Sequence, residues 1–359
     1  QPILRNFGFD ANLADVRTAR NNRIISAHDL ENQIRRTIDE TLQTYWDLVF
    51  AVENRSVRIE SLRRAERYLS IAQAQQQAGQ GNPLAILQAQ VEIARVQGDI
   101  LQAEQDLGDV EDRLKRLIMP DNLALETGAI LVPTEKPTLE QTDTDLEESI
   151  RIALENRPDV LAAKGRIENS RIAIARAENQ LLPIMNVKGA GGYTGVDDDL
   201  GNSWEDIHDL DNPLWRVGVE VEFPLGNRAA QAGFDRSRLE LSRNQIALDR
   251  LTKVVIVEVR ESIREIRTAQ KQIATTHQAR QLSQRQLEAE TLRFQQLQET
   301  SNKVLLDYEN DLTNAHLSEL QAFVKYKKAR IRLETAMASD IREYLRLAPL
   351  PAGYRHLEE

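Results

Sequence analysis

The sequence predicts a mainly α-helical protein with a few β-strands, in which long antiparallel coiled-coil helices are used twice as an internal two-fold repeat. Two long stretches are almost free of proline and glycine, and their apolar residues recur three and four positions apart, as on one face of a helix. Two shorter stretches alternate apolar and polar residues with the period of a β-strand. The same order of strand, long helix, turn and shorter helix occurs in both halves of the chain.

The composition excludes several classes of function. The 359-residue chain carries a net charge of −10 and no cysteine, which argues against nucleic-acid binding, disulfides and thiolate metal sites. Its five histidines lack the spacing of metal ligands, and the chain has neither a phosphate-binding glycine loop nor a nucleophile elbow. No stretch approaches the roughly 18 apolar residues of a membrane-spanning helix. We therefore expect no enzyme activity and no catalytic, cofactor-binding or metal site.

The first repeat spans residues 1–119 and begins with an apolar, turn-rich segment that reads as the end of a strand. A helix of roughly 65 residues follows, about 100 Å long at 1.5 Å per residue. Glycines and a proline then break the helical pattern, and a second helix returns antiparallel. In chain order we predict a strand end over 1–9, a helix over 11–78, a turn at 79–83 and a return helix over 84–118.

The second repeat spans residues 158–345 and contains a β-hairpin as well as long helices. It is preceded by a linker over 120–157, with a short helix over 146–156, and followed by a tail over 346–359. Within the repeat we predict a helix over 158–182, a hairpin over 184–223, a helix from 228 to about 299, a turn at 300–303 and a helix to about 345.

Residues at seven-residue spacing predict close packing between helices. Two such ladders are Ala315, Ala322, Ala329 and Ala336, and Val160, Ile167, Ile174 and Leu181. This spacing forms a seam that faces a neighbouring helix in a supercoil, and it also occurs in an ordinary two-stranded coiled coil. Helices about 100 Å long have no globular core to cover them, and one chain has too few helices to enclose a tube. We therefore expect a homo-oligomer.

The predicted hairpin has two interpretations. Its strands of about ten residues have the length and alternation of transmembrane β-barrel strands. A hairpin in a soluble sheet shows the same alternation. Three aromatic residues near the strand ends, Tyr193, Trp204 and Trp215, are candidates for an aromatic belt at a membrane interface or for packing within the hairpin.

Three segments have characteristic sequences: Asn156-Arg157-Pro158-Asp159-Val160-Leu161-Ala162-Ala163, Trp215 to Leu225, and Gln1 to Gly8. In these segments the chain resembles the outer-membrane efflux protein family, the TolC-like channels. With the order of helices and strands, the resemblance covers nearly the whole chain. The resemblance implies a homotrimer with four strands per protomer in one transmembrane β-barrel, continuous with a periplasmic α-helical barrel. This chain shows only three strands, so we expect the family's N-terminal helices and first strand, including the partner of Gln1–Gly8, to lie outside it.

The resemblance implies an outer-membrane channel subunit of a tripartite efflux or type I secretion system, extending into the periplasm. Export would be passive, through a trimeric tunnel set in outer-membrane lipid, with a periplasmic adaptor (membrane fusion protein) and an inner-membrane pump as partners. The alternative, from another class, is a soluble periplasmic coiled-coil scaffold or adaptor with the hairpin in a small sheet domain. An adaptor should show a lipoyl-like or barrel domain rich in glycine and valine, and this sequence shows none.

The resemblance also assigns candidate residues at the two helix–helix turns. It predicts that these turns form a periplasmic tip that docks the adaptor, through Ala78, Gly79, Gly81, Asn82, Pro83, Ser301 and Asn302. The second turn lacks the family's Ala-Gly, so Ser301 or Asn302 could equally serve as a helix cap alone. The family's latch tyrosine and arginine map onto Gln295 and Thr300, so that gating network is not preserved.

Two carboxylates near the second turn are candidates for a pore constriction. Asp307 matches an acidic position that lines the constriction in the family, and Asp311 lies one turn later. In a trimer each would form a ring of three carboxylates, which favours cations by direct electrostatics. The other acidic position of the family pair is Val304 here. The alternative for both aspartates is a carboxylate on a solvated helix face.

Overall fold

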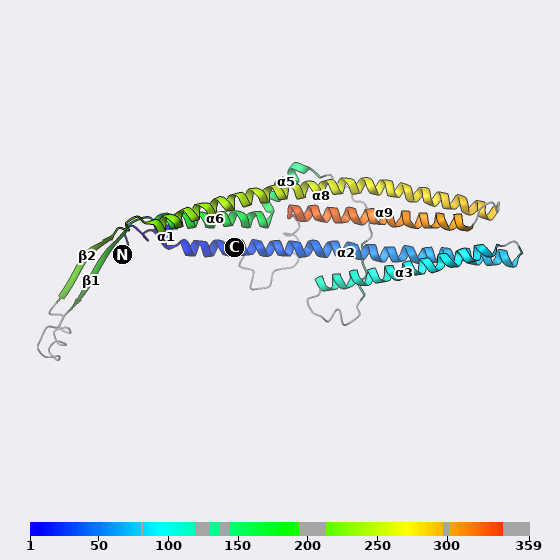
Figure 1. Ribbon diagram of the computed structural model, residues 1–359, viewed down its shortest axis with the longest axis horizontal. Coiled ribbons are helices and arrows are strands. Elements are labelled where there is room, and N and C mark those ends of the chain that lie inside the picture. Colours follow the sequence, from blue (N-terminus) through cyan, green and yellow to red (C-terminus); the bar gives the residue numbers. More distant parts are fainter. Residues whose placement is uncertain (80–81, 119–129, 136–143, 194–212, 297–301, 340–359) are drawn as a thin grey trace, which may run out of the picture. The chain divides into compact units, whose positions relative to one another are not determined.

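The computed structural model describes residues 1–79, 82–118, 130–135, 144–193, 213–296 and 302–339. These residues form helices and one antiparallel pair of strands, in agreement with the predicted mainly α-helical class. They belong to two compact units: unit 1 contains Gln1–Leu30 and Pro158–Lys253, and unit 2 contains Glu31–Arg157 and Val254–Glu359. Two long helices, α2 (Ala14–Gln77) and α8 (Arg228–Gln296), contribute residues to both units (Figure 1).

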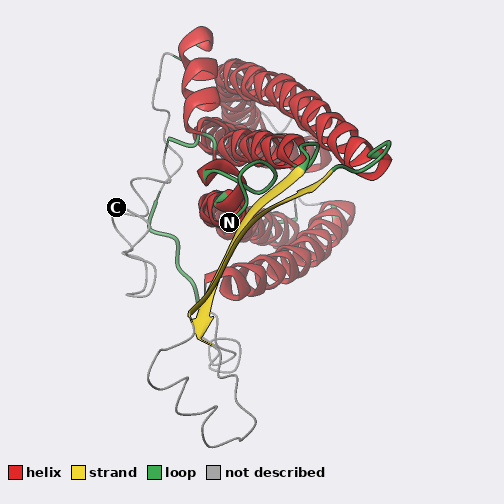
Figure 2. Ribbon diagram, turned by 90° about the vertical axis from the view of Figure 1, so that its left-hand side faces the viewer, coloured by secondary structure: helices red, strands yellow, loops and turns green. Residues whose placement is uncertain are grey.

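Unit 1 holds the predicted hairpin, formed by β1 (Ile184–Tyr193) and β2 (Pro213–Glu222). The strands are paired antiparallel over their full length, side by side in Figure 2. The alternation places the valines of both strands on one face and the charged side chains on the other. On the charged face, Lys188 Nζ lies 2.7 Å from Glu220 Oε2. The hairpin therefore has one apolar and one polar face.

The first residues of the chain pair with the free edge of β1. Val187 N donates a hydrogen bond to Gln1 O at 2.9 Å, and Ile3 N donates to Met185 O at 2.8 Å. The expectation that the strand partner of Gln1–Gly8 lies outside the chain is therefore wrong for this edge. In a β-strand, every second residue directs its N–H and C=O toward the same neighbouring strand. In β1, the odd-numbered residues Met185 and Val187 direct theirs toward the first residues of the chain.

A short helix, α1 (Phe9–Asn12), separates this segment from α2. The prediction of one helix that begins at residue 11 is therefore wrong at this end, since α2 begins at Ala14. Leu13, with φ −96° and ψ 4°, lies outside the α-helical region and breaks the run. The residues involved give no proline or glycine signal that would have located this break.

In unit 1, α6 (Pro158–Asn179) packs closely on the first part of α2. Gly165 makes the approach possible, because a Cβ at that position would lie 2.8 Å from Ile25 Cγ1. Two members of the predicted apolar ladder, Val160 and Ile167, are buried at 2% and 7% exposure. Ile174 is less buried, and Leu181 lies beyond the end of α6 at Asn179, short of the predicted end at residue 182. The seven-residue spacing therefore marks a buried side of α6 over the first half of the predicted ladder only.

Unit 2 contains α3 (Pro83–Ile118), α5 (Leu146–Asn156) and α9 (Asn302–Met337), with the remaining parts of α2 and α8. The bounds of α5 are those predicted. Figure 1 draws α9 between α8 and α2, and α3 along α2. Three alanines of the predicted ladder on α9 are buried, namely Ala322, Ala329 and Ala336. The division of the chain into two sequence repeats stays a prediction.

Ion pairs join α9 to both of its long neighbours. Lys328 contacts Asp47 of α2, and Arg332 Nη1 lies 2.9 Å from Glu265 Oε2 of α8. The interface between α2 and α9 also contains an apolar cluster of Trp46, Val49, Val324 and Ile331. The C-terminal half of α9 is therefore held by apolar packing and by ion pairs to both neighbours.

α9 ends at Met337, well before the predicted end at about residue 345. Ala338 adopts a left-handed φ of 52°. Its N–H donates to Thr335 O at 3.1 Å, while Ser339 N donates to Glu334 O at 3.4 Å. These two bonds form a Schellman motif, which terminates helices. The prediction failed because this position usually holds glycine, and here it holds alanine.

Candidate functional site

The turn between α2 and α3 is built by a glycine and a capping asparagine. Gly79 has a φ of 76°, in the left-handed region that glycine adopts without strain. Asn82 Oδ1 accepts a hydrogen bond from Leu84 N at 2.9 Å and so caps the first turn of α3. Pro83 is the first helical residue, where its missing N–H costs nothing. Three of the predicted tip residues thus have a clear structural role in making the turn.

The other predicted tip residues are described only in part. Ala78 lies in the turn, and its N–H donates to Ala74 O at 3.0 Å. Asn302 is the first residue of α9, so it is not the residue that precedes the helix. Gly81 and Ser301 lie outside the described residues. Docking of an adaptor at the two turns stays a prediction.

Asp307 and Asp311 are both exposed, one turn apart on the same face of α9. Among the described residues, neither carboxylate has an ion-pair or hydrogen-bond partner. The same exposed face continues along the helix with polar side chains, at Asn314, Ser318, Gln321 and Lys325. The structure therefore brings the two predicted carboxylates together at the start of a polar face.

The opposite side of α9 carries a buried charged cluster formed by Arg64, Tyr68, Glu309 and Thr313, which we name the clasp. Glu309 is 5% exposed. Its carboxylate accepts hydrogen bonds from Arg64 Nε at 2.5 Å and from Tyr68 OH at 3.0 Å. Arg64 Nη2 also donates to Thr313 Oγ1 at 3.3 Å. One carboxylate of α9 is thus held by donors from two successive turns of α2.

Burial, followed by the Glu309 carboxylate, raises the pKa of Tyr68 to about 12, because both disfavour the phenolate. The clasp borders an apolar cluster whose members are Leu287, Phe294, Leu305, Ile71, Tyr308 and Leu312, with Tyr68 among them. Since these side chains exclude water, the carboxylate of Glu309 depends on Arg64 for charge compensation.

A second buried carboxylate, that of Glu319, joins α9 to α8. His277 Nδ1 lies 2.5 Å from Glu319 Oε1, and Arg280 forms an ion pair with the other oxygen. Burial, and after it the charge of Arg280, lowers the pKa of His316. A buried carboxylate of α9 therefore ties this helix to α8, as another ties it to α2.

The clasp was not predicted from the sequence, although the sequence of α9 carries a signal for it. Leu305 and Leu320 lie on the buried side of α9, and Glu309 and Thr313 interrupt that side. A carboxylate within an apolar helical stripe indicates a buried partner, because an unpaired buried charge is costly. The identity of the partner, Arg64, depends on how helices from the two halves of the chain align, which the local sequence does not encode.

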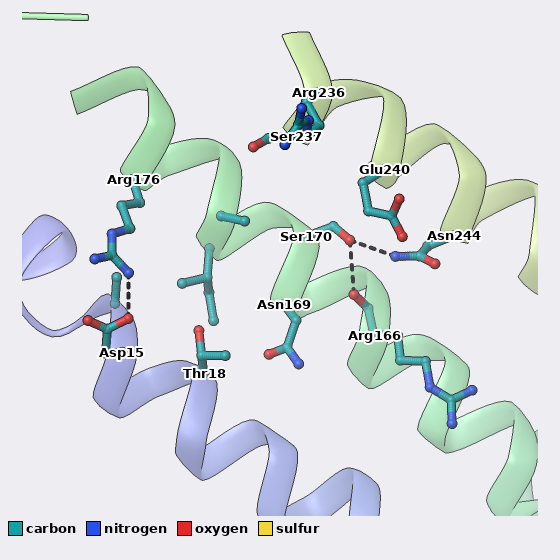
Figure 3. A pocket seen from close by; sticks show the side chains of 13 residues that line it. Asp15, Thr18, Arg166, Asn169, Ser170, Arg176, Arg236, Ser237, Glu240 and Asn244 are labelled. Atoms are coloured by element: carbon teal, nitrogen blue, oxygen red, sulfur yellow. Dashed lines mark hydrogen bonds and ion pairs between the residues drawn. The ribbon is translucent and has the colours of Figure 1, made fainter. Parts of the chain in front are cut away.

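In unit 1, a groove of about 640 Å³ opens between α2, α6 and α8 (Figure 3). Arg176 of α6 points toward α2, with its Nη1 2.5 Å from Asp15 Oδ1. On the other side of α6, Asn244 Nδ2 of α8 donates to Ser170 Oγ at 2.8 Å. These groups are engaged in contacts between helices, so the groove marks where the three helices are held together by polar side chains.

The hairpin places two of the three predicted interface aromatics. Tyr193 is the last residue of β1, and Trp215 of β2 is 78% exposed. Trp204 lies outside the described residues. Both described rings lie toward the end of the hairpin where the two strands are joined. Their contact with a membrane interface stays a prediction.

Metal binding and helical membrane spans can be assessed for the part of the chain that the structure describes. Within it, no group of three or more His, Asp or Glu side chains could hold a metal ion. No helix in this part has a stretch long and apolar enough to cross a membrane. The candidate functional sites in this part of the chain are the turns, the exposed aspartates of α9 and the clasp.

Three solved structures of outer-membrane proteins are similar to this chain in fold. The outer-membrane channel OprN is 17% identical, with a TM-score of 0.76 over 92% of this chain and 72% of that one. The CmeC outer membrane channel of Campylobacter jejuni is 17% identical, with a TM-score of 0.75 over 99% of this chain and 74% of that one. The outer membrane protein VceC of Vibrio cholerae is 17% identical, with a TM-score of 0.74 over 94% and 77%. Identities this low establish the fold alone.

The sequence itself decides the family. No curated protein matches the chain. The profile of the family described as "Outer membrane efflux protein" matches residues 7–118 and 149–339. These residues include all of α2, α3, α8 and α9 as well as the hairpin. Because the match covers well over half of the sequence, the chain belongs to the outer membrane efflux protein family.

Proposed function

We propose that the chain is the channel subunit of a tripartite efflux or type I secretion assembly, in which three copies form a tunnel for passive export. As an outer membrane efflux protein it is a transport protein of the outer membrane that extends into the periplasm, and not an enzyme. A periplasmic adaptor would be its partner at the turns, and an inner-membrane pump would complete the assembly. The soluble scaffold considered above has no support from the family match.

The observation that carries this proposal is an apolar stripe on α3 that no described residue covers. Its largest members are between 54% and 68% exposed, namely Leu84, Leu87, Val91 and Leu101. They fall at the three- and four-residue steps of a heptad seam. Another side of α3 is already buried within the chain, at Ala89, Val96 and Ala103. A helix with two seams requires a second neighbour, which another copy of the chain would supply.

α8 offers a matching apolar surface at a similar distance from the turns. Leu282 and Leu292 are 54% and 55% exposed. At 1.5 Å per residue, they lie about 21 Å and about 6 Å from the end of α8 at Gln296. The stripe on α3 reaches about 27 Å from its start at Pro83. The apolar surfaces of the two helices would therefore lie at the same level.

Farther from the turns, the two helices carry opposite charges. Exposed acidic residues lie about 35 to 44 Å from the start of α3, at Asp106, Asp109 and Asp112. Exposed basic residues lie about 38 to 48 Å from the end of α8, at Arg264, Arg267 and Lys271. Charge complementarity across an interface selects partner and register. It favours α8 of a second copy as the neighbour of α3.

An interface between two different surfaces of the same chain is heterologous, and it produces a ring when the rotation closes. Contact of α3 with α8 of the next copy would repeat around such a ring and enclose a passage. The number three rests on the resemblance to the family. In this arrangement the polar face of α9 would line the passage, and Asp307 and Asp311 would narrow it near the turns.

The hairpin supports insertion into the outer membrane. Its apolar face is exposed, with Val217 at 69% and Val219 at 59%. The other face carries Lys188, Arg216 and Glu220. Apolar side chains toward lipid and polar ones toward the lumen are the pattern of outer-membrane barrels. A soluble sheet would bury its apolar face instead.

Val91→Asp tests the assembly. A carboxylate buried in an apolar seam is costly, so we expect this variant to lose heat-modifiable trimers in outer-membrane fractions and conductance in planar bilayers. Gln97→Asp, at an exposed position of α3 that is already polar, is the control and should retain both. Conducting trimers formed by Val91→Asp would remove the α3 stripe from the interface. If the unmutated protein is soluble and does not conduct, the channel proposal is rejected.

A further inference from the structure

We infer that the clasp is a positioning device that fixes the rotation and height of α9, and that it thereby controls the ion preference set by Asp307 and Asp311. The residues of the clasp contact no solute and act only through the helix that carries the two aspartates. The inference rests on the proposed function, because it places the exposed face of α9 beside the passage. It assigns a role to a buried charged cluster that the channel function by itself does not require.

The rotation of α9 is set because Glu309 alone, on its side of the helix, can neutralise Arg64. The residues one turn away on that side are uncharged, namely Leu305, Leu306, Leu312 and Thr313. Each residue adds about 100° around the helix axis. A rotation of that size would turn the carboxylate away and leave the guanidinium, 19% exposed, with only the carboxylate of Glu60, 3.7 Å away on its own helix. The energetic cost of breaking the shorter, more buried pair with Glu309 therefore selects one rotation.

The height of α9 along α2 is set by the same contact. The alanine ladder repeats every seven residues, so a slip of one heptad, about 10 Å, would still present small residues to the seam. That slip would place Asn302 or His316 where Glu309 now lies. Neither side chain supplies a carboxylate to Arg64. One polar position in a helical seam is a known way to specify register.

This geometry links the clasp to the two aspartates. Asp307 and Asp311 lie two residues before and two residues after Glu309, which places both about 200° around the helix from it. When Glu309 points toward α2, both aspartates therefore point away from α2. The observed burial agrees, since Glu309 is 5% exposed and both aspartates are exposed. Release of this one contact would free both aspartates at once.

Tyr68 makes the contact directional. Its OH donates to one oxygen of Glu309 while Arg64 Nε donates to the other, so the carboxylate is held at both ends. Arg64 also reaches Thr313, one turn farther along α9. Two turns of α2 thus engage two turns of α9. A point contact would allow α9 to pivot, whereas this arrangement resists both rotation and sliding.

The test is Glu309→Gln, which removes the charge and preserves the shape. The full-length assembled channel is measured in planar bilayers under a salt gradient, where the reversal potential reports cation over anion preference. Spin labels at Ser70→Cys in α2 and Asn314→Cys in α9 report the distance between the helices, and the absence of native cysteine makes the labelling specific. We expect the loss of about half of the cation preference and a broader distance distribution.

Two further variants separate positioning from general loss of stability. The double variant Arg64→Glu with Glu309→Arg restores an ion pair in the opposite sense, and it should recover the narrow distance distribution and the cation preference. Asp47→Asn is the matched control, because it breaks the Lys328 pair between the same two helices. That pair lies about 28 Å from the clasp along α9. Asp47→Asn should leave the ion preference unchanged.

Each outcome decides a separate point. An unchanged distance distribution in Glu309→Gln overturns the positioning role. A broader distribution with unchanged ion preference overturns the link between the clasp and conduction, provided that Asp307→Asn does lower the preference. If Asp307→Asn also leaves the preference unchanged, the aspartates do not face the passage, and the proposed constriction fails along with this inference. Loss of trimers in Glu309→Gln, without rescue by the double variant, would make the clasp merely structural.

Discussion

The two units hold their long helices in register by different chemistry. In unit 2, the contact between α2 and α9 uses ionised side chains, at the clasp and at the pair of Asp47 with Lys328. In unit 1, the inner contacts of α6 use neutral amides, a hydroxyl group and a glycine. The ion pairs of α6 with α2, Arg176 with Asp15 and Arg166 with Asp29, join exposed side chains. Ionised contacts fix position strongly but respond to charge and pH, whereas neutral contacts depend on shape and do not titrate.

The neutral contacts of unit 1 form a short chain across α6. Asn21 Nδ2 of α2 donates to Gly165 O at 2.7 Å and to Asn169 Oδ1 at 2.8 Å. On the other side, Asn244 Nδ2 of α8 donates to Ser170 Oγ at 2.8 Å. Each group finds a partner without carrying a charge into the seam. Loss of one such bond costs about 1 kcal/mol, less than leaving a buried charge without its partner.

The largest effect expected from this comparison is that of Arg64→Ala. Removal of the guanidinium leaves Glu309 buried and uncompensated, which should lower the free energy of unfolding of the α9 region by about 3 kcal/mol. Hydrogen-exchange mass spectrometry would report the change in peptides from α9, while peptides from α6 should be unaffected. Arg67→Ala, at an exposed position on the same helix with only a 3.6 Å contact to Glu60, is the control and should cost almost nothing. Equal hydrogen exchange of the α9 peptides in both variants would show that the clasp does not stabilise α9.

The next effect concerns the close approach of α6 to α2. Gly165→Val would place a branched side chain where even a Cβ lies 2.8 Å from Ile25 Cγ1. We expect a loss of about 2 kcal/mol in the local stability of unit 1, measured by hydrogen exchange in α6. Ile25→Ala in the same chain should recover part of the loss because it opens space. Gly233→Ala in α8, where no atom lies within 4 Å of the added Cβ, is the control. A tolerated Gly165→Val would mean that this contact does not depend on shape.

A structural feature is predictable from the sequence when residues next to it in the chain specify it. The bounds of α5 were predicted because a capping Asp145 and the residue before a proline mark its two ends. The break at Leu13 and the end of α9 at Ala338 were missed because neither carries the expected glycine or proline. The exposed aspartates of α9 came from the resemblance to the family and not from periodicity. The clasp joins residues 245 positions apart, and such a pairing is fixed by packing of the two halves of the chain.

The smallest effect tests whether the ionised seam responds to pH. Tyr68 has a pKa of about 12 in the folded protein, against 10 in the unfolded chain. Below pH 10 the phenol is protonated in both states, and its favourable environment contributes in full. Between pH 10 and 12 the unfolded chain ionises first, so the α9 region should lose stability as pH rises.

Because Tyr68 is only half-buried, solvent screening reduces this loss to about 1 kcal/mol. Hydrogen exchange of α9 peptides between pH 9 and 11, corrected for the intrinsic rate, measures it. Tyr68→Phe cannot ionise, so its α9 peptides should show a smaller pH dependence in this range. Asn244→Ala should lower the stability of α6 equally at both ends of the range, because no group in that seam titrates there. If the two seams respond alike to alkali, the difference between ionised and neutral contacts does not govern how the two units hold their helices.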